Sequence, residues 1–167
     1  MKPEVSIILP SIRTERLEKL YDSILASTKR TFELVVVGPY PLPEKLRDLH
    51  NVKYAKDFGS PVRASNIAAS LCEGKIYTWF ADDCILFENS LDDCLDQFYA
   101  MGDSKNNVLV AKYYEGQEGS RERQTLQPDS YFKVNGTPAG SPHIPNDWWL
   151  FNIAFLHADF FNELGGW

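Results

Sequence analysis

Apolar runs and helix-period segments alternate through the first part of the chain. Residues 5–9 and 32–37 are nearly continuous apolar runs closed by turn-forming residues, a pattern typical of parallel strands buried on both faces. Between them, residues 14–27 carry apolar side chains at helical spacing, and Thr14 is placed to cap that helix. The pattern predicts a strand, a helix and a second strand in that order.

The same alternation continues to about residue 100. It predicts strands over residues 52–54 and 75–81, rich in β-branched and aromatic side chains, and helices over residues 64–71 and 90–98. Gly74 is expected to end the first of these helices, and Ser90 to cap the second. Such alternation predicts an α/β fold with a mostly parallel sheet flanked by helices.

The pattern changes after residue 100. Residues 108–114 predict one more strand, and residues 148–161 are strongly apolar, with a short helix over 158–164 closed by Gly165. Residues 115–147 are polar and rich in Gly, Pro and Ser, which is long for a structureless loop in a compact domain. We therefore expect a segment that is either mobile or organised by a ligand.

The composition is that of one globular domain without a nucleic-acid-binding face. The chain has 167 residues, of which 44% are hydrophobic, enough to form a core. Its net charge of -6 argues against duplex nucleic acid as a main partner. The N-terminus lacks a signal-peptide core, and no run reaches the length of a transmembrane segment. Three cysteines without a CxxC pair indicate reduced thiols, so we expect a cytoplasmic protein.

Asp82 and Asp83 are the sharpest candidates for chemistry. They directly follow the predicted strand over residues 75–81, and the carboxyl ends of such strands are where open α/β sheets bind ligands. Two adjacent carboxylates repel each other, and a hard divalent cation relieves that repulsion while keeping open positions for a diphosphate. The alternative is a solvated pair that caps the following loop.

The order of these segments resembles that of family 2 glycosyltransferases with the GT-A fold. A first strand ends in Pro10, a later loop and helix carry Arg63 and Asn66, and a further strand ends in Asp82-Asp83, similar to the family's DxD-type motif. The final sequence, FFNELGGW, is similar to another family element. The resemblance covers nearly the whole chain.

This resemblance implies one Rossmann-like GT-A domain over residues 1–167, in a naturally short or a truncated form. Residues 1–100 would be its nucleotide-binding half, and residues 101–167 its acceptor-side half. Pro10, Ser11 and Arg13 would line the base and ribose pocket, whereas Arg63 and Asn66 would approach the base or the phosphates. Asp82 would hold the ribose or share the metal, and Asp83 would coordinate Mn²⁺ or Mg²⁺ bridging the diphosphate.

The sequence departs from the family pattern at three positions. The second strand ends without an acidic residue for the base, at Val37-Gly38-Pro39. Tyr40 either stacks on the base in its place or packs on the surface. The third position of the DxD-type motif is Cys84, interpreted as an inert thiol. Arg63 lies two positions ahead of the family's arginine, so it is equally a solvated residue at the start of a helix.

The family's general base normally follows the Gly-Gly-aromatic element, where this sequence stops. Asp147 is the candidate substitute because Trp148 and Trp149 beside it could stack on an acceptor sugar. A structural role as a cap beside core tryptophans is equally compatible with its position. His143 is a second candidate, for the metal or the acceptor, and its alternative is a solvent-exposed loop histidine.

Two functions follow as hypotheses. One is a metal-dependent, inverting hexosyltransferase-type enzyme that moves a sugar from a nucleotide-diphosphate donor to an acceptor hydroxyl. UDP-sugars are the commonest donors, and the acceptor is an unidentified sugar, lipid or protein. The other is a nucleotide-sugar-binding protein without transferase activity. The turn after the first strand, Pro10-Ser11-Ile12-Arg13, lacks the glycines of a dehydrogenase. The aromatic residues near the C-terminus could form an interaction module, or they could complete the core or a homo-oligomer contact, which the short chain favours.

Overall fold

The computed structural model describes residues 2–102, 105–111 and 153–167. Asp147, His143 and the segment over residues 115–147, expected to be mobile or organised by a ligand, lie outside the described residues. The chain divides into two units, residues 1–109 with 155–167 and residues 110–154.

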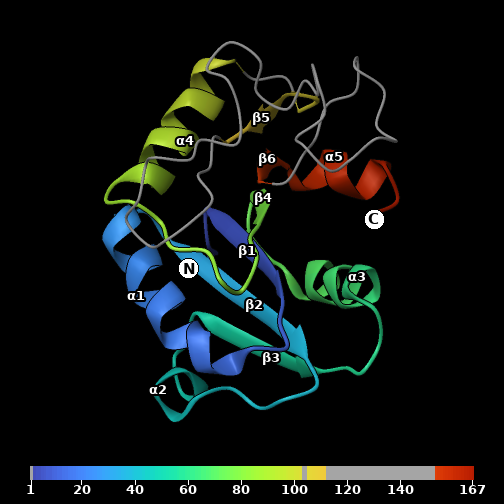
Figure 1. The fold of residues 1–167 in the computed structure, drawn as a ribbon. Coiled ribbons are helices and arrows are strands. Elements are labelled where there is room, and N and C mark those ends of the chain that lie inside the picture. Colours follow the sequence, from blue (N-terminus) through green and yellow to red (C-terminus); the bar gives the residue numbers. More distant parts are fainter. Residues whose placement is uncertain (1, 103–104, 112–152) are drawn as a thin grey trace, which may run out of the picture. The chain divides into compact units, whose positions relative to one another are not determined.

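Six strands and a set of mostly short helices make up the described residues (Figure 1). The strands are β1 (Val5–Pro10), β2 (Phe32–Gly38), β3 (Val52–Lys56), β4 (Ile76–Trp79), β5 (Val108–Val110) and β6 (Ala154–His157). The helices are α1 (Leu17–Ser27), α2 (Glu44–Arg47), α3 (Pro61–Leu71), α4 (Ser90–Ala100) and α5 (Ala158–Glu163), with a 3-10 turn, η1, over Thr14–Arg16.

The strands form one mixed sheet in the order β3-β2-β1-β4-β6-β5. Strands β1 to β4 are parallel, with Ile8 paired to Val35 on one side and to Trp79 on the other. Strand β6 pairs antiparallel with β4. Because β1 and β2 are central, their residues are almost all buried, which explains the continuous apolar runs of the sequence.

Side chains alternate between the two faces of the sheet and form a core on each. On one face, Ile8, Val35 and Tyr77 pack with the alanines of α3 and with Phe161 of α5. The alternate residues, such as Ile7 and Leu34, face the other side, where α1 and α4 contact each other (Figure 1). The predicted α/β architecture with helices on both faces is confirmed.

Three helix ends differ from the sequence predictions. Thr14 begins the 3-10 turn η1, and α1 starts only at Leu17, without a side-chain cap. Ser90 is the first residue of α4, and Asn89 precedes it in the left-handed conformation, with φ 59°, which asparagine tolerates better than most residues. Gly74 does not end α3, which stops at Leu71 with Cys72 as its C-cap. A side chain at Gly74 would collide with Ser6, so the role of this glycine is close packing.

The predicted end of the last helix is confirmed. Gly165 follows α5 with φ 84°, a conformation that favours glycine. Its N–H donates to the carbonyl of Asn162 at 3.1 Å, and Gly166 donates to Phe161 at 3.3 Å. No helix within the described residues has both the length and the hydropathy that crossing a membrane requires.

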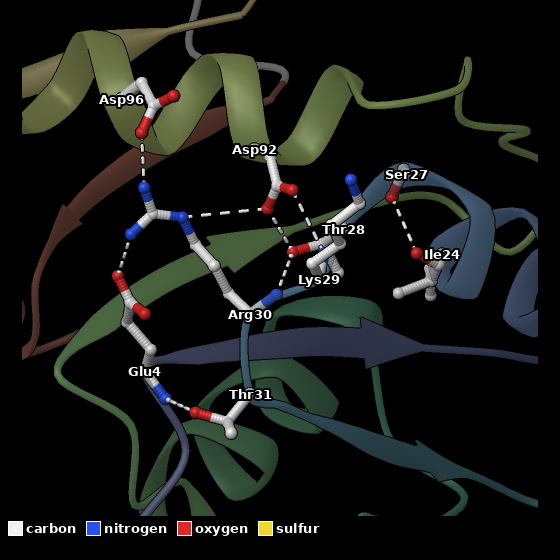
Figure 2. A network of polar contacts seen from close by, with 9 residues as sticks. All are labelled: Glu4, Ile24, Ser27, Thr28, Lys29, Arg30, Thr31, Asp92 and Asp96. Atoms are coloured by element: carbon white, nitrogen blue, oxygen red, sulfur yellow. Dashed lines mark hydrogen bonds and ion pairs between the residues drawn. The ribbon is translucent and has the colours of Figure 1, made fainter.

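A polar network ties α4 to the segment between α1 and β2 (Figure 2). Arg30 pairs with Glu4, Asp92 and Asp96, so one guanidinium joins the start of β1 to two turns of the helix. Asp92 also accepts a hydrogen bond from the backbone N–H of Lys29 at 3.0 Å. The network fixes α4, and thereby the far end of the loop that follows β4.

A second network holds the turn between α3 and β4. The buried carboxylate of Glu33 accepts hydrogen bonds from Ser6, at 2.5 Å, and from the backbone N–H groups of Glu73 and Gly74. Its other oxygen pairs with Lys53 at 2.8 Å. Burial by itself raises the pKa of Glu33, but the bonds from Lys53, Ser6 and Glu73 outweigh it and hold the pKa below its ordinary value.

Candidate functional site

The candidate site lies where the order of the strands reverses. From β1 the chain proceeds outward through β2 and β3 and then returns to place β4 on the other side of β1. In open α/β sheets, ligands bind outside the carboxyl ends of the strands at such a switch point. The segments that meet there follow β1, with Ser11, Ile12 and Arg13, and β4, with Asp82 and Asp83.

Asp82 is buried, and donors from the segment after β1 surround its carboxylate. Its Oδ2 accepts hydrogen bonds from the Ser11 hydroxyl at 3.0 Å and from the backbone N–H groups of Ile12 and Arg13 at 3.2 and 3.1 Å. Its Oδ1 accepts Nε of Arg13 at 2.7 Å and also Nη2. Both oxygens are therefore committed to one short loop, which Asp82 holds in place.

These contacts determine the charge states of Asp82 and Arg13. Burial of the Asp82 carboxyl raises its pKa, but the hydrogen bonds from Arg13 and Ser11 outweigh that effect, and the pKa lies below its ordinary value. The hydrogen bond to Asp82 in turn raises the pKa of Arg13. Both groups are thus charged at neutral pH, as a buried carboxylate with an arginine fork requires.

Asp83 is in a different environment from its neighbour. Its side chain is 41% exposed, against 4% for Asp82. Arg13 Nη1 lies 3.0 Å from Asp83 Oδ2, and Arg16 Nη1 lies 3.8 Å from the same oxygen. The second carboxylate of the motif is therefore accessible from solvent and faces two guanidinium groups.

The side chains at this position could hold a divalent cation only together with ligands from outside the protein. Within the described residues, no cluster of three or more His, Cys, Asp or Glu side chains could enclose a metal. Mg²⁺ and similar hard cations, however, are commonly bound by one or two carboxylates together with phosphate oxygens and water. Asp83 fits that mode, because its carboxylate is exposed at the edge of the sheet where such a ligand would enter.

Backbone packing explains why β2 ends without an acidic residue. A Cβ at Gly38 would collide with the carbonyl oxygen of Ser11, while the Ser11 N–H donates to Val37 at 2.9 Å. Pro10, the last residue of β1, leads directly into this close approach. Gly38 thus lets the loop that contacts Asp82 pack against the end of β2.

Asp57 is an acidic residue at this edge of the sheet that was not singled out in the sequence. It follows β3, whose Lys56 pairs with Gly38, and its own N–H donates to the Gly38 carbonyl at 3.1 Å. The buried carboxylate accepts the Gly59 N–H at 2.8 Å and pairs with Arg63 at 2.9 Å. Its signal in the sequence is Asp-x-Gly after a strand, which ordinary turns share.

Arg63 and Asn66 both lie on α3 but are engaged by the protein. Arg63 is exposed and reaches back to Asp57. Asn66 accepts the Trp167 N–H at 2.9 Å and donates to the carbonyl of the same residue at 3.4 Å. The Trp167 ring contacts that of Trp79 at the end of β4, with centroids 4.4 Å apart. Asn66 thereby holds the C-terminal residues beside β4.

Exposed apolar side chains follow three neighbouring strands. Ile12 comes after β1, Tyr40 after β2 and Phe58 after β3, and each exposes more than half of its surface. The Tyr40 side chain is thus available to a flat ligand at this edge. Cys84, by contrast, is half-buried, and burial raises the pKa of its thiol, which agrees with an unreactive role.

Comparison with known proteins identifies the fold. No family model and no curated protein matches the sequence. Among solved structures, S. aureus TarS 1–349 superposes with a TM-score of 0.64 at 20% identity, over 99% of this chain and 49% of that one. A second structure of S. aureus TarS gives a TM-score of 0.62 at 22% identity, over 98% and 29%.

A third similar structure is the mannosyltransferase PcManGT from Pyrobaculum calidifontis in complex with GDP-Man and Mn²⁺, with a TM-score of 0.62 at 15% identity, over 99% of this chain and 48% of that one. The chain has the GT-A fold. It spans about half the length of these GT-A proteins, or less. The predicted fold class is confirmed, and Asp82 and Asp83 lie at the switch point of the GT-A sheet.

Proposed function

We propose that this chain is the donor-binding part of a metal-dependent glycosyltransferase. The donor would be a nucleoside-diphosphate sugar, with UDP the first base to test, and the acceptor a hydroxyl group. Inversion at the anomeric carbon is included on the strength of the family resemblance. The observation that carries the proposal is the position of Asp82 and Asp83 at the switch point of a GT-A sheet, opposite the loop after β1.

The geometry supports different roles for the two carboxylates. Asp82 would hold the loop of Ser11 to Arg13 in its binding conformation, because both of its oxygens are already committed to that loop. Asp83 would hold the cation together with the diphosphate. When bound, a divalent ion supplies Lewis acidity that stabilises the charge on the departing diphosphate. The side chains of Arg13 and Arg16 lie at the same point and would carry part of that charge.

The nucleoside would lie across the carboxyl ends of β1, β2 and β3. Pro10 and Ser11 border the end of β1, and Tyr40 offers an exposed ring after β2. Asp57 and Arg63 form an ion pair after β3, so the acid that β2 lacks is present on the neighbouring strand. PcManGT is similar in fold and was solved with GDP-Man and Mn²⁺, which makes GDP the second base to test.

The acceptor side of the proposal rests on residues beyond the described ones. Asp147 remains the proposed general base, and His143 an alternative contact to the metal or acceptor. A base must come within hydrogen-bond reach of the acceptor hydroxyl to take its proton. Asp147→Asn would then abolish transfer while leaving donor binding unchanged, which separates its role from that of Asp83.

Titration calorimetry with UDP and GDP, in Mn²⁺, tests donor binding directly. We expect one of the two to bind wild type and Asp48→Asn, and Asp83→Asn to bind at least about tenfold more weakly, or ~1.4 kcal/mol. Asp48 is a matched control because it precedes β3 and so lies near the amino ends of the strands, whereas the candidate site lies at their carboxyl ends. Failure of both nucleotides to bind wild type would contradict the proposal.

Donor turnover distinguishes the two functions that the sequence left open. Release of free sugar or transfer from a bound nucleotide sugar, lost in Asp83→Asn, would show a glycosyltransferase. Binding without release over a panel of donors and acceptors would instead show a nucleotide-sugar-binding protein.

A further inference from the structure

Arg13 bridges the two carboxylates at the end of β4. Its Nε and Nη2 bind Asp82, and its remaining nitrogen, Nη1, lies 3.0 Å from Asp83. Arg16, in the 3-10 turn that follows, places a second guanidinium 3.8 Å from the same oxygen of Asp83. Two positive groups therefore face the carboxylate of Asp83, which is otherwise exposed to solvent.

This arrangement disfavours a cation that arrives alone. A divalent ion at Asp83 would meet two guanidinium groups a few ångströms away, and like charges at such distances repel even in water. Asp82 cannot compensate, because both of its oxygens accept hydrogen bonds from the loop after β1. Within the described residues, no third acidic, histidine or cysteine side chain completes a metal cluster at this position.

A nucleoside diphosphate would change this balance. Its phosphates are anionic, and planar guanidinium forks bind phosphate oxygens well. Arg16 can make the larger move, because it is half-exposed and touches Asp83 only at 3.8 Å. Arg13 stays anchored to Asp82 and has only Nη1 to redirect. Both shifts leave Asp83 free to bind a cation between itself and the diphosphate.

We propose that Arg13 and Arg16 form a latch on Asp83 that couples cation binding to the arrival of a nucleoside diphosphate. The inference rests on the proposed function and adds an order to it: the cation binds weakly alone and tightly with the diphosphate. Because coupling is reciprocal, the cation strengthens nucleotide binding by the same factor. The latch also keeps Asp83 paired when no donor is present.

The test measures binding of Mn²⁺ alone to the full chain, by the decrease in the spin-resonance signal of free Mn²⁺. Arg16→Gln removes the outer half of the latch without disturbing the Arg13 pair with Asp82. We expect this variant to bind Mn²⁺ alone about threefold to tenfold more tightly than wild type, the size expected for one charge at this distance in water. UDP, or GDP if that is the base bound, should bind the variant more weakly.

Lys29→Gln is the matched control, because it also removes one exposed positive charge, at the amino end of β2. It should leave Mn²⁺ affinity at the wild-type value. Arg13→Lys serves as a second variant, because a lysine paired with Asp82 cannot also contact Asp83, which moves the positive charge away from the cation. It too should tighten binding of Mn²⁺ alone, with its fold checked by circular dichroism.

Unchanged Mn²⁺ affinity in both Arg16→Gln and Arg13→Lys would overturn the latch. If the nucleoside diphosphate and Mn²⁺ still bound cooperatively to those variants, the donor-site proposal would stand without the latch. If wild type bound no nucleoside diphosphate at all, both proposals would fail together.

Discussion

Two adjacent aspartates at the end of β4 have environments that differ more than their positions in sequence suggest. Asp82 is buried beneath donors from the loop after β1, whereas Asp83 is exposed and faces Arg13 and Arg16. Successive residues after a strand point in different directions, so one can be structural while the other meets the ligand. At the residue scale, Asp82 is part of the architecture of the site, whereas Asp83 is the residue that we propose contacts the ligand.

Asp82→Asn tests the structural assignment. The amide keeps the shape but offers an N–H where the carboxylate accepts several hydrogen bonds, and it leaves Arg13 without its charged partner. We expect the free energy of unfolding to fall by about 1.5–3 kcal/mol, the size of hydrogen bonds to charged groups. Urea unfolding measures this, with Asp83→Asn as the exposed neighbour that should change stability much less. Equal effects of the two substitutions would contradict the division of roles.

At the scale of elements, two ion networks, one buried around Glu33 and one partly exposed around Arg30, hold the turns that position the sheet. Glu33, on β2, joins β1 and β3 to the turn before β4, because its partners come from these three segments. Arg30 joins the start of β1 to α4 (Figure 2). The two networks lie at the amino ends of the strands, so the carboxyl ends remain for the site.

The lowered pKa of Glu33 predicts a pH dependence of stability. Its folded-state pKa is below the unfolded value of about 4.3, so the unfolded chain binds more protons in acid. The stabilisation is fully present above the unfolded pKa and is lost as the pH falls through the folded one. Glu33→Gln should therefore lower the unfolding free energy at pH 7 by about 1–3 kcal/mol, and the deficit should shrink in acid. Glu44→Gln, on the exposed start of α2, should show no such deficit.

Arg30→Lys tests the network of Figure 2. A lysine supplies one point charge and cannot reach Glu4, Asp92 and Asp96 at once. We expect a loss of about 1 kcal/mol in unfolding free energy that diminishes as salt is added, because salt screens partly exposed charges. Lys29→Gln is the control, since Lys29 contacts Asp92 only through its backbone. A deficit that persists unchanged in high salt would contradict the electrostatic origin.

For the whole molecule, local sequence patterns predicted the helices and strands, whereas the contacts within the candidate site depend on the order of the strands. The apolar runs ending in Pro10 and Val37 marked β1 and β2 because buried parallel strands have that composition. Asp82 and Asp83 follow β4 as predicted, although the strand ends at Trp79, two residues earlier than expected. The pairing of Asp82 with Arg13 could not be predicted, because those residues are 69 positions apart and meet only when β4 lies beside β1.

The same reason explains the other gaps in the prediction. Asp57 follows a short strand, and only the pairing of β3 with β2 places it beside Gly38. The engagement of Asn66 by Trp167 depends on β6 and α5 returning to β4. Sequence patterns report local burial and turns, whereas these contacts depend on how distant segments assemble.

The central claim is that Asp83 binds a cation shared with a nucleoside diphosphate. Calorimetric titration of UDP and of GDP, each with and without Mn²⁺, into wild type and Asp83→Asn tests it most directly. The account predicts that Mn²⁺ strengthens binding of one nucleotide to wild type at least about tenfold, or ~1.4 kcal/mol, and that Asp83→Asn loses this gain while retaining the weaker metal-free binding. An equal gain from Mn²⁺ in the variant would contradict the account.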